Sequence, residues 1–283
     1  MSDIVIELDN GAVVGSTAGN YAIFKGVPYA KPPIGELRWR PPVELDPWPE
    51  AIQAKKYPSA AWQLGVDTKL FIAEIINQSG FSTVKRNLFK ALFSRFGQSS
   101  ESEDCLYLNI RTPSEKKQTG LPVMIWIHGG DHQDGSGNGF PYETDVFCDE
   151  GVILVTINYR LGVMGFLCHP ELSLESSDGT SGNYGMLDQI AALKWVQENI
   201  AAFGGDPEQV TIFGESAGGE SVAHLLTSPF AEGLFQRAII QSAANSGQMI
   251  HQTLAVLHHD SGERIGQKLA DDLVPGSNQI QAL

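Results

Sequence analysis

The segment VTIFGESAGGES, residues 210–221, constrains the fold of this chain most strongly. Its first half alternates β-forming residues, and its second half consists of small residues that can open a helix. A strand that turns abruptly into a helix forces its corner residue, here Ser216, into a sparsely populated backbone conformation. Gly214 and Gly218 flank the corner and carry no Cβ atoms, so neighbouring backbone can approach closely. The segment therefore predicts an α/β fold with a sharp corner at Ser216.

The corner would also place the Ser216 hydroxyl where it can react. The free N–H groups and the dipole at the amino end of the following helix favour a developing negative charge. The pattern Gly-x-Ser-x-Gly between a strand and a helix is typical of a nucleophilic serine. A glycine-rich turn whose serine only caps the helix contains the same residues. The motif therefore needs support from the rest of the chain.

Hydrophobic runs predict the strands around this corner. Residues 122–128 and 152–158 are continuous apolar runs, as in strands that are buried on both faces. Residues 237–242 form a further strand, and residues 184–203 have helical spacing. Strands that alternate with helices imply parallel crossovers. We therefore expect an α/β fold with a mostly parallel central sheet and a ligand site at the carboxyl ends of its strands.

Three other segments predict local structure. Residues 4–8 and 12–16 flank Asn10-Gly11, a strong hairpin signal. Residues 26–49 are rich in proline, which predicts an extended surface segment. Residues 69–96 are amphipathic and predict two short helices with a break near Ser79-Gly80.

Composition limits the partners. The 283 residues carry a net charge of −14, which argues against nucleic acid or anionic membranes as partners. No apolar run reaches the ~18 residues of a membrane span, and the first residues do not resemble a secretory signal. The three cysteines are far apart, which favours a reduced, cytoplasmic protein.

No motif points to a cofactor or a metal. The glycine-rich loop at residues 128–139 does not end in the Gly-Lys-Ser/Thr of a phosphate-binding loop. The run His258-His259-Asp260 does not have the ligand spacing of a zinc site. We therefore expect no cofactor and no metal.

Six blocks resemble the type-B carboxylesterase family, which includes relatives of the cholinesterases, and they follow the order found in that family. They are residues 24–42, 102–110, 122–130, 155–167, 181–219 and 235–243. The resemblance implies the α/β-hydrolase fold and a serine carboxylic-ester hydrolase that acts on a small-molecule ester. It also implies that residues 1–283 are a single domain whose carboxyl-terminal part is missing.

The resemblance implies roles for six residues at one site. Ser216 matches the nucleophile that forms the acyl-enzyme, and the backbones of Gly130, Asp131 and Ala217 match the donors of the oxyanion hole. Gly129 and Glu215 match neighbours of the substrate.

Asp131 departs from the family, whose members usually have glycine or alanine there. A carboxylate beside an oxyanion is repulsive, so we expect Asp131 to turn to solvent or to His132. In the alternative interpretation, Asp131 or His132 activates water against an acyl or phosphyl adduct.

Other matches imply structural roles. The resemblance pairs Glu103 with Arg38 and Asp188 with Arg160, as buried ion pairs that hold loops onto the sheet. Cys105 matches a cysteine that secreted relatives bridge, but no partner follows Tyr57-Pro58 here, so we expect a free thiol.

A serine nucleophile needs a base and an orienting carboxylate, which follow the serine in α/β-hydrolases. The later histidines are His224, His251, His258 and His259, and the last three are expected on a polar surface helix. The sequence therefore predicts that the triad acid and histidine are missing. The alternative is a non-catalytic cholinesterase-like binding module or an inactive gene fragment. In both cases an apolar sheet edge would be open, which predicts association between chains.

Overall fold

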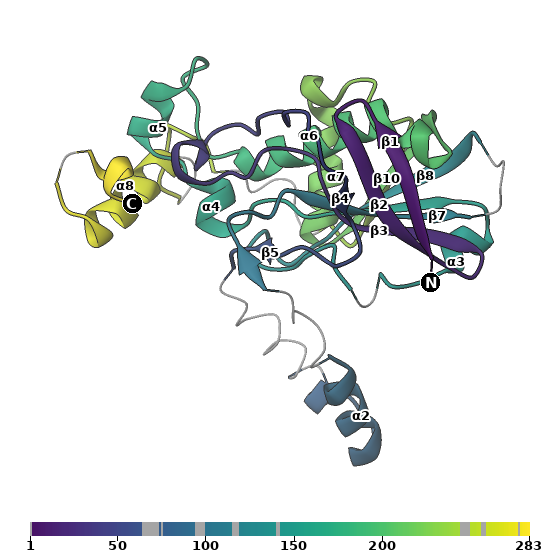
Figure 1. Ribbon diagram of the computed structural model, residues 1–283. Helices are drawn as coiled ribbons and strands as arrows, with labels where there is room; N and C mark the ends of the chain where they lie inside the picture. Colours follow the sequence, from purple (N-terminus) through teal and green to yellow (C-terminus); the bar gives the residue numbers. More distant parts are fainter. Residues whose placement is uncertain are drawn as a thin grey trace.

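The computed structural model centres on one mixed β-sheet (Figure 1). It describes residues 2–63, 74, 76–93, 100–114, 119–139, 142–243, 250–255, 259–276 and 278–283. Within these residues, nine strands form the main sheet. They are β1 (Asp3–Leu8), β2 (Gly11–Ala18), β3 (Tyr21–Pro28), β4 (Ile52–Gln53), β7 (Tyr107–Pro113), β8 (Leu121–Ile127), β9 (Ile153–Ile157), β10 (Gly205–Glu215) and β11 (Arg237–Gln241).

The remaining elements are a second small sheet and the helices. Strands β5 (Ala60–Ala61) and β6 (Glu101–Ser102) pair with each other. The longer helices are α2 (Thr83–Phe93), α6 (Tyr184–Asn199), α7 (Ala217–Thr227) and α8 (Gly262–Leu273). The shorter ones are η1 (Gly35–Leu37), α3 (Val146–Asp149), α4 (Gly162–Phe166), α5 (Pro170–Glu175), η2 (Ile200–Phe203), η3 (Pro229–Ala231) and α9 (Gln279–Ala282).

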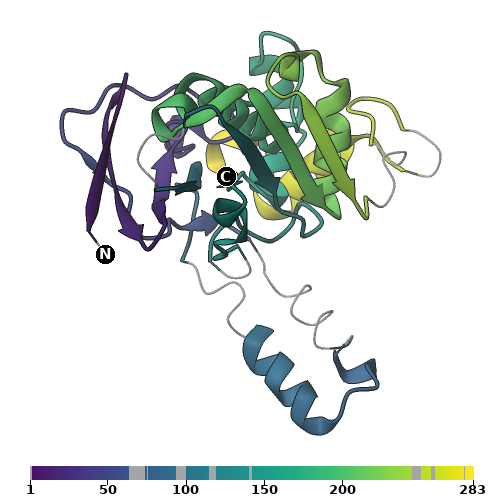
Figure 2. The same ribbon diagram turned by 90° about the vertical axis from the view of Figure 1, so that its right-hand side faces the viewer.

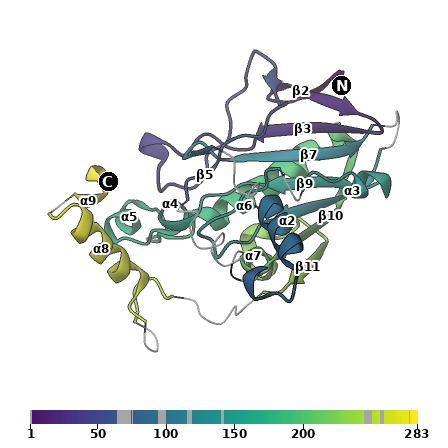
Figure 3. The ribbon, with the colours of Figure 1, turned by 90° about the horizontal axis from the view of Figure 1, so that it is seen from below.

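The main sheet has a parallel half and an antiparallel half. Its order is β1-β2-β3-β7-β9-β8-β10-β11, with β4 beside β2, and much of this order can be followed in Figure 3. Strands β9, β8, β10 and β11 pair in parallel, whereas β1, β2, β3, β7 and β9 pair antiparallel. The four strands expected at residues 122–128, 152–158, 210–214 and 237–242 are thus confirmed as parallel neighbours.

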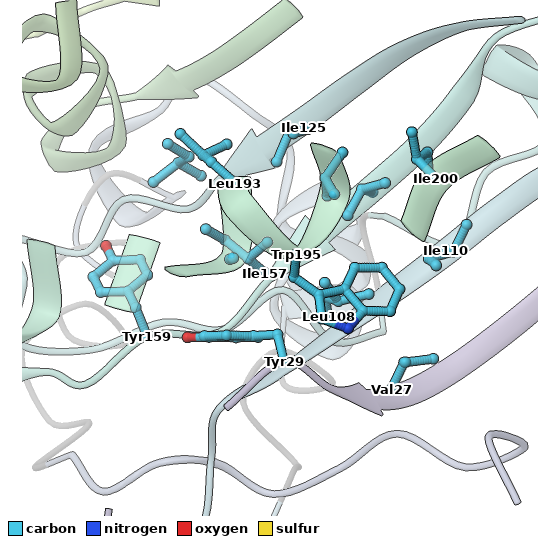
Figure 4. Packing of buried hydrophobic residues seen from close by; sticks show 14 of the residues in the cluster. Val27, Tyr29, Leu108, Ile110, Ile125, Ile157, Tyr159, Leu193, Trp195 and Ile200 are labelled. Carbon is cyan, nitrogen blue, oxygen red and sulfur yellow. The ribbon is translucent and has the colours of Figure 1, made fainter. Parts of the chain in front are cut away.

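The apolar runs form central strands that are covered on both faces, and their side chains make up much of the core. All five residues of β9 are buried, because β9 has a strand on each side and side chains packed on both faces. Helices α6 and α7 add Leu193, Val196 and Val222 to the same cluster (Figure 4 shows part of it). Burying one such side chain contributes roughly 1.5–3 kcal/mol relative to leaving it exposed.

The predictions for the amino-terminal half hold in the described residues. Strands β1 and β2 form the hairpin at Asn10-Gly11, with Leu8 opposite Gly11. Of the proline-rich segment 26–49, residues 29–49 contain only the single turn η1 and are otherwise extended or irregular. Residues 26–28 are an exception, because they belong to β3 of the main sheet. The chain is helical at residues 76–78, bends at Ser79-Gly80 and is helical again in α2. Residues 64–73 and 94–99 lie outside the described residues.

Helix α2 projects from the body on the side where β10 and β11 end (Figure 2). Val84 and Leu88 of this helix are 78% and 68% exposed. Strands β8, β10 and β11 run parallel, so their carboxyl ends lie at one edge of the sheet, where the sequence predicts the ligand site.

The sequence predicts a polar helix around His251, His258 and His259, and this prediction is wrong for the residues that the structure describes. Residues 250–255 and 259–260 are not helical, and His258 lies outside the described residues. The helix begins only at Gly262, because the Ser261 hydroxyl caps it by accepting a hydrogen bond from the Arg264 N–H at 3.3 Å.

Candidate active site

Ser216 stands at the corner between β10 and α7. Its backbone angles are φ 57° and ψ −127°, so it adopts the positive φ expected from the sequence. The Ser216 N–H donates a hydrogen bond to the carbonyl of Gln241 in the neighbouring strand, at 2.9 Å. This bond fixes the strained corner to β11.

Glycine is required on both sides of the corner because backbone passes there. A Cβ atom on Gly214 would lie 2.4 Å from the carbonyl carbon of Gly218. A Cβ atom on Gly218 would lie 2.1 Å from the carbonyl oxygen of Ile127, the last residue of β8. The two glycines therefore let the elbow close against the neighbouring strand.

Replacing Gly218 with alanine should destabilise the fold by roughly 3 kcal/mol, because β8 or α7 must move to relieve the contact. The matched control is Gly80→Ala, since nothing lies within 4 Å of a Cβ atom at that position. The control should change stability by less than about 1 kcal/mol. Urea denaturation of both variants measures the difference, and equal midpoints would contradict the close approach.

The glycine-rich loop after β8 lies directly against the serine. A Cβ atom on Gly129 would lie 2.5 Å from the Glu215 carbonyl oxygen and 3.2 Å from the Cβ atom of Ser216. Gly130 follows with φ 105°, and Asp131 and His132 both have positive φ. In the described part of the chain, no protein group accepts a hydrogen bond from the backbone N–H of Gly130, Asp131 or Ala217. These donors are therefore open to a ligand.

Asp131 and Glu215 are exposed, whereas Ser216, Gly129 and Gly130 are partly buried. The carboxylate of Asp131 thus has access to solvent, as in the simpler of the two interpretations of this residue. His132 is partly buried, and its Nε2 lies 3.0 Å from the Ser221 hydroxyl.

His128, the residue before the loop, is held as a neutral ring. Its Nδ1 donates to the Gly129 carbonyl at 2.8 Å, and its ring stacks on Tyr159 with centroids 4.4 Å apart. The Tyr159 hydroxyl donates to the His128 carbonyl at 2.8 Å. Burial lowers the pKa of His128 to about 4. His128 therefore orients the start of the loop.

Acidification should destabilise this part of the fold. An unfolded histidine titrates near 6.5. Between about pH 6.5 and about pH 4 the unfolded chain therefore binds more protons than the folded one, and the free energy of unfolding falls as the pH falls. The pKa shift corresponds to a loss of about 3 kcal/mol across that window. Urea denaturation of the wild type and of His128→Asn over that range measures the slope, which should be smaller in the variant. Equal slopes would contradict this assignment.

The two expected ion pairs are present but differ in burial. Arg160 donates to both carboxylate oxygens of Asp188, at 2.8 and 2.7 Å, with side chains that are 3% and 0% exposed. Arg38 binds Glu103 in the same bidentate manner, at 2.7 and 2.8 Å. The prediction that this second pair is buried was wrong, because its side chains are 31% and 26% exposed.

Within the described residues, the Ser216 hydroxyl has no hydrogen-bond partner. The rings of His128 and His132 are engaged with Gly129 and Ser221, and His224 lies in the last turn of α7. The described residues also contain no cluster of side chains that could hold a metal ion.

Sequence reasoning missed one group of residues beside the site. Ser221 is fully buried and binds both His132 and the amide of Gln189 in α6, each at 3.0 Å. The only sequence signal is that Ser221 follows Ser216 by about one and a half helical turns.

The sheet order, its parallel half and the corner at Ser216 define an α/β-hydrolase fold. A sequence model described as "Carboxylesterase family" matches residues 2–273. The chain belongs to the carboxylesterase family, as expected from the sequence.

Several relatives are similar over nearly the whole chain. Fumonisin B1 esterase of Sphingopyxis macrogoltabida is 40% identical over 290 residues, which are 98% of this chain and 48% of that protein. Para-nitrobenzyl esterase of Bacillus subtilis (strain 168) is 38% identical, over 99% of this chain and 54% of that protein. A solved structure of a thermophilic PNB esterase superposes with a TM-score of 0.78 at 35% identity, over 99% of this chain and 51% of that one. The chain spans about half the length of these relatives.

Two further findings concern the chain as a whole. Among the described helices, none has the length and apolar character needed to cross a membrane. Cys105, Cys148 and Cys168 are all free thiols. Cys105 is therefore unpaired, as expected.

Proposed function

We propose that this chain carries the nucleophile and the oxyanion hole of a serine carboxylic-ester hydrolase. One observation carries the proposal: the loop of Gly129 and Gly130 lies against Ser216, which has positive φ at the start of α7. Three open N–H donors beside one hydroxyl suit an acyl-transfer site.

In this proposal the Ser216 hydroxyl oxygen attacks the carbonyl carbon of the ester. A base takes the hydroxyl proton, and the carbonyl oxygen becomes an oxyanion that accepts hydrogen bonds from Gly130, Asp131 and Ala217. The tetrahedral intermediate collapses to an acyl-enzyme, and the alcohol leaves with the proton. Water then attacks the acyl carbon, the bond to Ser216 breaks, and the carboxylic acid leaves as the serine hydroxyl is regenerated.

We further propose that these 283 residues do not supply the base or its orienting acid. The support is that no described histidine hydrogen-bonds to Ser216. In this view, residues 1–283 are a single α/β-hydrolase domain without the carboxyl-terminal part of the family fold. Loss of the base leaves roughly 10³- to 10⁴-fold catalysis over water in a serine triad enzyme.

The substrate class in this proposal is a small-molecule carboxylic ester, with no cofactor, nucleic acid or membrane as partner. The net charge of −14 supports the exclusion of nucleic acid and of anionic membranes. Three free thiols support a cytoplasmic location.

The second candidate is a non-catalytic cholinesterase-like binding module or an inactive gene fragment. The exposed carboxylate of Asp131 beside the donors favours it, because a negative charge there opposes an oxyanion. The strained Ser216 corner opposes it, since a binding module has no need for such strain.

We also propose that two copies of the chain associate through β11. Among the described strands, β11 lies at the end of the sheet, and its Ile239 and Ile240 are 43% and 45% exposed. Open apolar strand edges pair with other chains. Light scattering should show a mass above that of the monomer, and Ile240→Lys should lower it. A monomeric wild type would contradict the proposal.

The function is tested with the chain alone and with an extended chain. The extension, added at the carboxyl end, is the segment of the B. subtilis para-nitrobenzyl esterase that follows the part similar to this chain. The chain alone should hydrolyse p-nitrophenyl acetate only slightly above background. The extended chain should turn over. No turnover by a folded extended chain would favour the binding module, whereas fast turnover by the chain alone would show that it contains its own base.

A further inference from the structure

His132 connects the oxyanion loop to the helix that follows the nucleophile. Its Nε2 lies 3.0 Å from the Ser221 hydroxyl, in the second turn of α7. One side chain of the loop therefore contacts α7 directly.

The helix side of this contact is itself fixed. Ser221 is fully buried, and the Gln189 side-chain amide lies 3.0 Å from its hydroxyl. Gln189 is also fully buried, in α6. The side chains of His132, Ser221 and Gln189 thus join the loop, α7 and α6 in one chain of hydrogen bonds.

The loop side needs such a support because its backbone is strained. Asp131 and His132 have φ angles of 55° and 54°, in the left-handed region that residues other than glycine avoid. Such conformations persist only where the surrounding structure enforces them. The His132 carbonyl accepts a hydrogen bond from the Gly162 N–H at 2.7 Å, and its ring packs on Phe166 with centroids 5.2 Å apart.

We propose that His132 is a positioning residue, which holds the Gly130 and Asp131 N–H groups at a fixed place relative to Ala217 and Ser216. This inference rests on the proposed esterase function and adds to it the residue that preorganises the oxyanion hole. Preorganised donors stabilise an oxyanion without rearrangement during the reaction. His132 does not touch the reacting atoms.

The charges around the ring suit this role. Burial lowers the pKa of His132, while Glu220 and Asp131 raise it and His224 lowers it. The ring is therefore neutral near neutral pH, with one nitrogen that donates and one that accepts. A neutral ring adds no further charge beside the site.

Two substitutions of His132 separate its hydrogen bond from its strain. A glutamine side chain reaches the position of Nε2 and can keep the bond to Ser221, whereas an asparagine side chain is one methylene shorter. Asparagine adopts positive φ more readily than glutamine. If the hydrogen bond to Ser221 positions the loop, His132→Gln should retain more activity. If backbone strain decides the position of the loop, His132→Asn should retain more activity.

The extended chain is assayed with p-nitrophenyl acetate. In His132→Asn and Ser221→Ala the kcat should fall about 10- to 100-fold, because a shift of the donors by about 1 Å has effects of that size. The KM should change little, and His132→Gln should retain most of the kcat. Combining His132→Asn with Ser221→Ala should cost no more than one change alone, since both break the same contact. Gln133→Ala, an exposed neighbour in the same loop, is the control.

Hydrogen exchange of the chain alone gives a readout that does not need turnover. The amides of Gln133, Asp134 and Gly162 donate hydrogen bonds to the loop carbonyls of Gly130 and His132. Their exchange should be faster in His132→Asn than in the wild type or His132→Gln. If exchange follows this order but the extended wild type is inactive, the proposed function fails and the positioning by His132 stands. The inference would be overturned if His132→Asn left both the exchange rates and the kcat unchanged. It would also be overturned if the kcat of His132→Asn were higher than that of His132→Gln.

Discussion

Replacing Ser216 with alanine should lower the kcat of the extended chain for p-nitrophenyl acetate by about 10⁶-fold, the size of effect seen when a triad serine is removed. The reason is that Ser216 stands at the corner between β10 and α7, with the Gly129–Gly130 loop against it and the open N–H of Ala217 beside it. The fold should persist, because an alanine in place of this serine adds no atom to the crowded corner.

Ser228→Ala is the matched control for this change. Ser228 follows the same helix α7, and its side chain makes no capping hydrogen bond. Its kcat should stay within a factor of about two of the wild type, since the residue contacts no part of the proposed machinery. Equal activity of the Ser216 variant and this control would contradict the assignment of the nucleophile.

Replacing Asp188 with alanine should lower the free energy of unfolding by about 3–5 kcal/mol. The change leaves the Arg160 guanidinium in the interior without its partner, with a side chain that is only 3% exposed. The carboxylate also accepts a hydrogen bond from the Arg160 backbone N–H, at 3.0 Å. The variant therefore loses an ion pair and the anchor of the segment that follows β9. Urea denaturation measures the loss.

Two further variants make this prediction specific. Asp46→Ala breaks the surface pair between Asp46 and Lys31, in which Asp46 is 80% exposed, and should cost at most about 1 kcal/mol. The double change Arg160→Leu and Asp188→Leu removes both buried charges and should recover part of the loss. If Asp188→Ala were as mild as Asp46→Ala, the buried pair would not stabilise this fold.

Local rules explain which parts of the fold could be predicted from the sequence. The corner at Ser216 was predictable because Gly214 and Gly218 carry no Cβ atoms and so allow the close backbone approach that such a corner needs. Strands β8 and β9 were predictable because continuous apolar runs are typical of central parallel strands. The hairpin followed from Asn10-Gly11.

The errors and omissions concern tertiary structure. The partial exposure of the Arg38–Glu103 pair depends on what packs around it, which the pairing pattern does not contain. The residues around His251 have little apolar periodicity from which a helix could be located. The observed helix α8 begins instead after its cap at Ser261. The contact of His132 with Ser221 and Gln189 joins three elements far apart in the sequence.

The roles of the six site residues rest on geometry and on resemblance. In the structure Gly129 lies against Ser216 and Glu215, a contact that the motif spacing alone could not predict. The negative charge of Asp131 opposes an oxyanion at the proposed hole. Because Asp131 is exposed, water screens part of that repulsion.

The most direct test of the account is to map the acyl group after the extended chain reacts with p-nitrophenyl acetate. The reaction is quenched with acid in its first turnover, and peptides are analysed by mass spectrometry. The account predicts one acetyl group on the peptide that contains Ser216, and none on that peptide in Ser216→Ala. An active chain that carries no acetyl group at Ser216, or carries it on another residue, would contradict the account.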